Sequence, residues 1–276
     1  MAKKRSSAGR IIGNTLTLLT IGFCSAVFTF AVLNILDWYR DNRATNDVIT
    51  SIQDSVKITE NNKDAEIIGN DVDKSNIYWD FIKMNMLEVD FSELKRRNSD
   101  TVGWIQIPDT NINYPFVQTK DNDYYLHRSF DKKKNSAGWV FLDYRNNIAD
   151  LDQNTIIYAH GRYDMTMFGS LRRMLESGWT NNPQNHVVRI STETENTLWQ
   201  VFSVYHLPTT TDYLYTNFQS DRNYENFLKM ITSRSAHNFN ATAAAKDHIL
   251  TLSTCYNKQE RMVLHAKLIK RQLRYA

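Results

Sequence analysis

One thiol in the polar part of this 276-residue chain is a candidate nucleophile. The chain has two cysteines, and Cys24 lies within an uncharged apolar segment, so Cys255 is the single thiol of the polar sequence. Cys255 ends the apolar run HILTLSTC, which is typical of a strand whose last residue opens to solvent. The thiolate is the reactive form of cysteine. Cys255 is therefore either an inert thiol or a covalent catalyst supported by a nearby base or cation.

Two other positions have the chemistry to assist such a thiol. His160 follows the apolar run NTIIYA and precedes Gly161, so its imidazole could reach into a groove beyond a strand end. Arg261 begins the run RMVLHAKL shortly after Cys255, and a strand hairpin would bring the two together. Spacing alone does not select either residue. A histidine is more often part of the surface or core, and an arginine at a strand start is more often a surface charge.

The run that Arg261 begins alternates between two faces, as a strand with two different surroundings does. One face carries only apolar side chains: Met262, Leu264, Ala266 and Leu268. The other carries Arg261, Val263, His265 and Lys267. We therefore expect the guanidinium of Arg261 to lie outside the core.

The elements that must hold these residues are mostly short strands. From residue 101 onward, β-branched and aromatic runs alternate with Asn, Asp, Gly and Pro. They predict strands over 103–107, 116–117, 138–142, 155–158, 187–190, 198–205, 248–252 and 261–269. Helical spacing predicts helices over 168–175 and 222–233, and one or two amphipathic helices over 76–98. Many strands with few helices indicate a mostly β domain, a closed or nearly closed barrel decorated with helices.

The N-terminal part has the pattern of a membrane anchor. Residues 11–36 carry no charge, and at about 1.5 Å per residue such a helix can cross a hydrocarbon core of about 30 Å. Four basic residues precede it, namely Lys3, Lys4, Arg5 and Arg10. The positive-inside rule then predicts a cytoplasmic N-terminus and an extracellular remainder. A cleaved signal peptide is the alternative, but the apolar run is longer than the usual ~7–15 residues and no A-x-A ends it.

These patterns divide the chain into four parts. We expect a cytoplasmic tail (1–10), a single transmembrane signal anchor (11–36), an extracellular spacer (37–75) and a catalytic domain (76–276). The formal charge of +3 comes from 33 basic and 30 acidic residues, and no basic stripe suggests nucleic acid as a partner. The sequence lacks CxxC and HExxH motifs, so it predicts no metal, and it predicts no other cofactor.

Three motifs together resemble the sortase family. They are TLSTC at 251–255, YAHG at 158–161 and the arginine that opens the next strand, Arg261. The resemblance extends over 89–126, 138–146 and 167–171, covers roughly 76–276, and is similar in texture to the class B sortases. It departs from the family where Ala159 stands in place of the glycine that commonly precedes the histidine, and in the short connection between the cysteine and the arginine.

The resemblance implies a fold and a set of site residues. The fold would be a closed eight-stranded sortase-type β-barrel with an N-terminal helical extension. Cys255 would be the nucleophile, His160 the acid and base, and Arg261 the group that holds the oxyanion or the substrate backbone. By analogy, four residues would contact the substrate: Ser253, Asn122, Leu126 and Tyr213.

The implied enzyme is a membrane-anchored cysteine transpeptidase of a Gram-positive envelope. It would cleave secreted proteins at a C-terminal sorting motif through a thioacyl-enzyme and transfer them to an amine of cell wall peptidoglycan. A pilin-polymerising sortase, with a pilin lysine as acceptor, is one alternative. A cysteine endopeptidase that uses water and a catalytically silent binding domain are two others.

Overall fold

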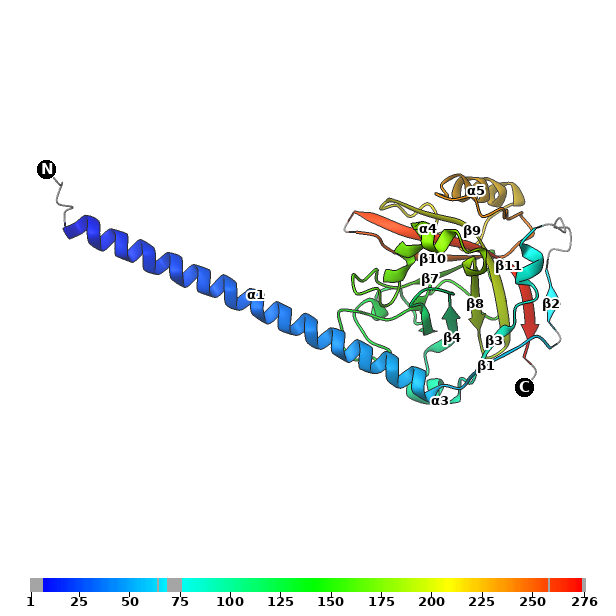
Figure 1. The fold of residues 1–276 in the computed structure, drawn as a ribbon, viewed down its shortest axis with the longest axis horizontal. Coiled ribbons are helices and arrows are strands. Elements are labelled where there is room, and N and C mark those ends of the chain that lie inside the picture. Colours follow the sequence, from blue (N-terminus) through cyan, green and yellow to red (C-terminus); the bar gives the residue numbers. More distant parts are fainter. Residues whose placement is uncertain (1–6, 64, 69–75, 258, 275–276) are drawn as a thin grey trace. The chain divides into compact units, whose positions relative to one another are not determined.

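The computed structural model describes residues 7–63, 65–68, 76–257 and 259–274 (Figure 1). Six residues of the expected tail (1–6), part of the expected spacer (64 and 69–75) and residues 258, 275 and 276 lie outside the described residues. The chain forms two compact units, one that ends at Asn46 and one that comprises residues 47–276.

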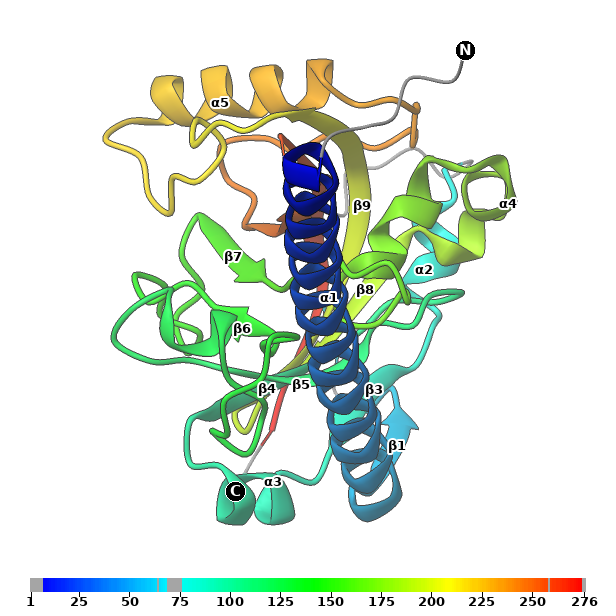
Figure 2. The same cartoon turned by 90° about the vertical axis from the view of Figure 1, so that its left-hand side faces the viewer.

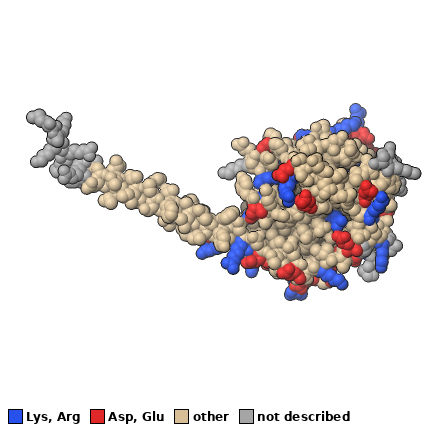
Figure 3. All heavy atoms as spheres, in the orientation of Figure 1, with Lys and Arg blue, Asp and Glu red and all other residues tan. Residues whose placement is uncertain are grey.

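The first unit is part of a long helix, α1 (Ser7–Ser55), which continues well past the end of the uncharged segment. In the described part of the chain, this is the one helix that is long and apolar enough to cross a membrane, judged by length and composition. Its large apolar side chains are exposed, including those of Phe23, Phe28 and Phe30. Figure 3 accordingly shows a stretch of α1 without charged side chains. On the compact second unit, both signs of charge are interspersed.

Eight strands of the second unit form a ring. They are β4 (Thr101–Gln106), β5 (Asn113–Val117), β6 (Phe141–Leu142), β7 (Asn154–Tyr158), β8 (Val187–Ser191), β9 (Glu195–Pro208), β10 (Ile249–Cys255) and β11 (Glu260–Leu273). Their order is β10-β7-β6-β5-β4-β8-β9-β11, and a pairing between β10 and β11 closes the ring. The β7–β10 and β5–β6 pairs are parallel, and the other pairs are antiparallel. The expectation of a closed eight-stranded barrel is confirmed.

The two faces of β11 pack against different surroundings, as the alternation predicted. Met262, Leu264, Ala266 and Leu268 join the main core cluster. Val263 belongs to a second cluster with Tyr205 and Phe227, beneath helix α5 (Asp221–Ser233). Figure 2 shows α5 lying across the barrel beside β9. The hydroxyl of Ser220 accepts a hydrogen bond from the backbone N–H of Asn223 and so caps the start of α5.

The segment 76–98 contains two short helices, but a strand separates them. The helices are α2 (Tyr78–Phe81) and α3 (Ser92–Arg97), and the strand is β3 (Met86–Val89). The sequence predicted one or two helices over 76–98, and it did not predict the strand between them. The strand forms because β1 (Ile58–Asn61) pairs with it while Leu87 and Val89 pack in the main core.

The remaining elements are short. Strand β2 (Glu66–Ile67) pairs with β11 near the C-terminal end of β11, at Lys270 and Arg271. Three 3-10 helices and one α-helix lie in the connections: η1 (Tyr124–Leu126), η2 (Gly169–Leu175), α4 (Ser177–Thr180) and η3 (Pro183–Asn185). The helix expected over 168–175 is therefore present, but in the tighter 3-10 form.

Candidate active site

Cys255 and Arg261 face each other across the hairpin that closes the barrel. They are directly opposed in the antiparallel β10–β11 register, and both are partly buried. Opposed residues in such a pair direct their side chains to the same face, with Cβ atoms about 4.5–5.5 Å apart. The guanidinium of Arg261 donates one hydrogen bond to the carbonyl of Glu260, at 3.3 Å, and forms no ion pair within the described residues. The guanidinium therefore keeps donors that can bind an anionic oxygen.

His160 lies beside this pair at the end of β7. Strands β7 and β10 run parallel, and their last paired residues are Tyr158 and Ser253. Two residues further along the chain in each case are His160, just beyond β7, and Cys255, the last residue of β10. Between these positions, the Thr254 hydroxyl donates a hydrogen bond to the Ala159 carbonyl, at 2.7 Å. The structure thus brings Cys255, His160 and Arg261 to the same end of three neighbouring strands.

The imidazole of His160 is oriented by a backbone carbonyl. Its Nε2 lies 2.8 Å from the carbonyl oxygen of Leu126. A carbonyl oxygen can only accept, so Nε2 carries the hydrogen and Nδ1 carries the lone pair. Burial lowers the pKa of His160 below its usual 6.5, the Leu126 carbonyl opposes that effect, and the nearby His127 and Arg162 add to it. At neutral pH the imidazole is therefore mostly uncharged and can accept a proton at Nδ1.

His265, which lies on the same strand as Arg261, is buried in the interior. It is fully buried, and the Tyr205 hydroxyl lies 2.9 Å from its Nε2. Thr251 donates its hydroxyl hydrogen to Asn154 and lies 2.9 Å from Nδ1, so it accepts the Nδ1 hydrogen. Burial lowers the pKa of His265 to about 3. This histidine is neutral and fully hydrogen-bonded.

Ser253 and Tyr213 form a buried pair next to the thiol. The two hydroxyl groups lie 3.0 Å apart. Ser253 is two residues before Cys255 on β10, so both side chains lie on the same face of the strand. Burial raises the pKa of Tyr213, so its hydroxyl stays protonated at neutral pH. This hydrogen bond ties the segment between β9 and α5 to the strand of the nucleophile.

Asn122 is near the site, but its carboxamide is held by the protein at both ends. Its amide nitrogen donates to the carboxylate of Asp143, and its oxygen accepts from the backbone N–H of Tyr144, both at 3.0 Å. These bonds fix the loop that continues into η1, where the Leu126 carbonyl holds His160. In this structure, Asn122 shapes the loop, and Leu126 contributes its backbone carbonyl as well as its half-buried side chain.

Asp143 is a residue that the sequence did not single out. Its carboxylate is fully buried and accepts hydrogen bonds from the Arg145 guanidinium, at 2.9 and 2.7 Å, and from the Tyr158 hydroxyl, at 2.9 Å. Burial raises the pKa of Asp143, but the bonds from Arg145 and Tyr158 outweigh that effect and hold the pKa below its usual range. Arg145 also donates to the carbonyl of Leu214, at 3.0 Å. Asp143 thus links β7 to the segments that carry Asn122 and Tyr213.

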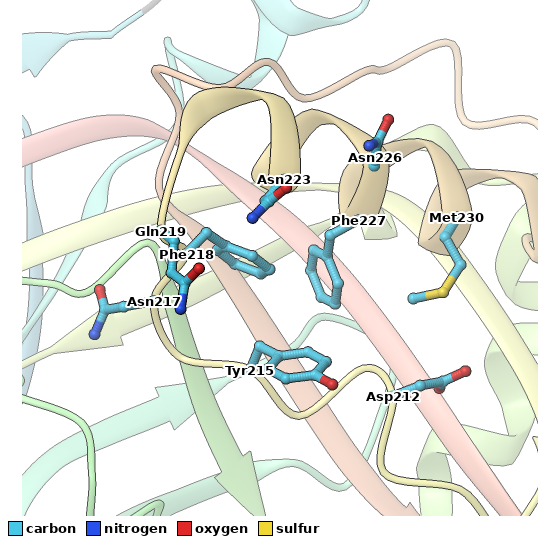
Figure 4. Close-up of a pocket in the computed structure, with 9 residues that line it drawn as sticks. All are labelled: Asp212, Tyr215, Asn217, Phe218, Gln219, Asn223, Asn226, Phe227 and Met230. Carbon is cyan, nitrogen blue, oxygen red and sulfur yellow. The ribbon is translucent and has the colours of Figure 1, made fainter.

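A separate hollow of about 560 Å³ lies beside α5. Figure 4 shows its aromatic side chains, Tyr215, Phe218 and Phe227, and the side chain of Asp212 on one side. The Asp212 carboxylate accepts two hydrogen bonds from Arg234, at 2.9 and 2.6 Å, so its charge is compensated. None of the predicted site residues lines this hollow.

Known proteins that are similar to this chain in sequence and fold identify its family. A model of the sortase domain matches residues 105–269, more than half of the chain. Sortase B of Listeria monocytogenes is 39% identical over 183 residues, which cover 64% of this chain and 73% of that protein. The chain also resembles the structure of sortase B from Bacillus anthracis in complex with AAEK1. The two are 34% identical, with a TM-score of 0.66, and the match covers 86% of this chain and 99% of that chain.

A third likeness is to a structure of sortase B complexed with triglycine. It has 32% identity and a TM-score of 0.62, and it covers 71% of this chain and 88% of that chain. The chain therefore belongs to the sortase family, whose members are cysteine transpeptidases. Its relatives are sortase B proteins, and it is a class B member of the family.

Proposed function

We propose that Cys255 is the nucleophile of this transpeptidase, that His160 is its acid and base, and that Arg261 stabilises the oxyanion. One observation carries the proposal: Cys255 and Arg261 are directly opposed at the ends of β10 and β11, and the adjacent parallel strand β7 leads into His160. A thiol, an imidazole with a free lone pair and a guanidinium can together supply the nucleophile, the base and the oxyanion donor of acyl transfer through a thioester.

The first half-reaction forms the thioacyl-enzyme. Nδ1 of the neutral His160 accepts the proton of the Cys255 thiol, and the sulfur attacks the carbonyl carbon of the scissile peptide bond. The guanidinium of Arg261 donates hydrogen bonds to the oxygen that becomes negative. The C–N bond then breaks, and the protonated His160 gives its proton to the leaving amine.

The second half-reaction passes the acyl group to an acceptor amine. His160, neutral again, accepts a proton from the incoming amine as its nitrogen attacks the thioester carbon. The C–S bond breaks, and the proton taken by His160 returns to the sulfur. Because one peptide bond is broken and another is formed, the reaction needs no external energy source or cofactor.

The substrates would be secreted proteins that carry a C-terminal sorting motif, and the acceptor an amine of cell wall peptidoglycan. The solved complex of a sortase B with triglycine supports a glycine-type amine as the acceptor. Ser253, Tyr213, Asn122 and Leu126 would border the groove for the sorting motif. In support, Asn122 and Leu126 lie in or next to the loop that Asp143 holds, and Tyr213 is hydrogen-bonded to Ser253 on the strand of Cys255.

The helix α1 would anchor the enzyme in the membrane with its N-terminus in the cytoplasm. The exposed apolar side chains and the uncharged segment of α1 support this arrangement. In wall-stripped intact cells, added protease should then remove the catalytic domain and leave a short protected fragment. Full resistance of the domain would contradict the predicted orientation.

The activity is tested with the full chain in detergent, a library of C-terminal sorting peptides and triglycine. We expect a peptide–triglycine product and a covalent peptide adduct at Cys255, both detected by mass spectrometry. Products that contain only water as acceptor, whatever the triglycine concentration, would instead indicate a cysteine endopeptidase. Cys255→Ala serves as the control without a nucleophile.

A further inference from the structure

The two residues proposed to exchange a proton lie beyond the point where their strands are paired. The parallel β7–β10 ladder ends at Tyr158 and Ser253. His160 and Cys255 follow that last pair by two residues each, so the ladder no longer fixes the distance between them. Other bonds must do so, because acyl transfer depends steeply on the relative position of base and nucleophile.

A single arginine bridges the two segments just past these residues. Nη2 of Arg172, on η2, donates to the carbonyl oxygen of Gly161 at 3.2 Å and to that of Tyr256 at 2.7 Å. Gly161 directly follows His160, and Tyr256 directly follows Cys255. On the other side, the Thr254–Ala159 hydrogen bond joins the residues that directly precede them. His160 and Cys255 therefore lie between two cross-links, one before and one after.

The guanidinium of Arg172 is itself held in place by aromatic rings. Its central carbon lies 5.0 Å from the ring centre of Tyr163 and 5.7 Å from that of Tyr256. The Tyr256 ring stacks in turn on the His206 ring, with centres 4.7 Å apart. Cation–π contacts at such distances are favourable and limit the orientations of a planar guanidinium. Arg172 and these contacts, together called the clamp, thus join the loop after β7, the turn after β10 and strand β9.

We propose that Arg172 is a positioning residue of the transpeptidase, which sets the separation of His160 and Cys255 by binding the carbonyls that follow them. This inference rests on the proposed roles of those two residues. Arg172 itself donates only to backbone carbonyls and takes no part in bond making. Nη2 carries two hydrogens, so this one nitrogen can donate to the two carbonyls of different segments at once.

The experiment compares Arg172→Ala, Arg172→Lys and the matched control Arg173→Ala in the peptide and triglycine assay with the full chain. Arg173 is the next residue on η2, is also partly buried, and its side chain forms no hydrogen bond or ion pair among the described residues. For Arg172→Ala we expect kcat to fall at least about tenfold while KM changes less than about threefold, because proton transfer and not peptide binding is disturbed. Arg172→Lys keeps a cation that can reach one carbonyl and should recover part of the loss.

The pH profile separates positioning from a loss of folded protein. The pKa of His160 is lowered mainly by burial. We expect release of the clamp to let the loop after β7 move away from β10 and to expose His160. The pKa then rises toward 6.5, and the acidic limb of the kcat/KM profile moves to higher pH. Fewer folded molecules would lower the whole profile without moving that limb, and a melting curve records the folded fraction.

Two outcomes overturn the clamp: kcat of Arg172→Ala within twofold of Arg173→Ala, or a reduced kcat with an unmoved acidic limb. The proposed function fails separately, if Cys255→Ala in the same assay still forms product. An inactive Cys255→Ala together with a normal Arg172→Ala would reject the clamp alone.

Discussion

The backbone of the His160 loop comes very near that of the Cys255 strand at Gly161. A Cβ atom built on Gly161 would lie 1.9 Å from the carbonyl oxygen of Cys255 and 3.0 Å from the hydroxyl oxygen of Thr254. The first contact is with backbone, which cannot rotate away as the end of a long side chain can. Gly161→Ala must therefore push the two segments apart.

The size of that displacement follows from the contact. Real Cβ atoms essentially never approach a heavy atom closer than 3.0 Å, so the 1.9 Å contact must open by at least about 1 Å. A misplacement of about 1 Å between reacting groups costs about 10²-fold in rate. We expect acylation by Gly161→Ala to slow by about 10²-fold or more.

The assay is the rate of thioacyl-enzyme formation on a cognate peptide, measured at saturating peptide, with a melting curve of each variant. Gly178→Ala is the matched control, because a Cβ there would meet nothing within 4 Å. The control should acylate at the wild-type rate. An acylation rate for folded Gly161→Ala within a few fold of wild type would show that the spacing of the two segments does not limit the reaction.

Four further results are expected. Cys255→Ala should form neither adduct nor product, and recovery of turnover would exclude this thiol as the nucleophile. His160→Ala should slow turnover at least ~10²-fold, and the wild-type rate should fall as pH drops through the lowered pKa of His160, below 6.5. Arg261→Ala should slow acylation roughly 10²–10³-fold without a matching loss of stability, and Arg261→Lys should keep a large defect if the planar fork binds the oxyanion. The pKa of His265 is about 3 in the folded chain and 6.5 when unfolded, so its contribution to the free energy of unfolding is complete above pH 6.5 and is lost as pH falls. At pH 5 the loss should be about 2 kcal/mol. Urea unfolding of wild type and His265→Gln at both pH values measures it as the difference between the two proteins.

Most of the barrel strands, and the position of Cys255 at the end of one of them, were predictable from sequence. The alternation over 261–268 placed Arg261 on the face opposite the core, and the packing of Met262 and Leu264 agrees with it. These signals are local, because one side of a strand is buried and the other is not. The roles of Cys255, His160 and Arg261 came from family resemblance, and spacing alone would not have selected His160 among seven histidines.

What the sequence could not provide depends on contacts between distant segments. Leu87 of strand β3 belongs to a series of apolar residues at helical spacing, yet the segment forms a strand because β1 pairs with it. Asp143 and Arg172 are ordinary charged residues in the sequence. Arg145, which holds Asp143, reaches a carbonyl 69 residues away from itself, and Arg172 reaches one 84 residues away. Partners that lie far away along the chain leave no pattern in the residue types around either side chain.

The closure of the ring by its last two strands affects how the chain acquires its reactivity. The β10–β11 hairpin supplies both the thiol and the guanidinium, whereas β7, which leads to the imidazole, precedes it by nearly a hundred residues. Pairings between segments so far apart form late, because the entropy of closing a long loop opposes them. Partly folded states in which the local hairpin has formed and β7 has not yet joined it therefore bring Arg261 to the sulfur but leave His160 away from it. In the proposed mechanism, Cys255 then gains its base only when β7 pairs with β10, so closure of the barrel and reactivity toward peptide bonds arise in the same folding step.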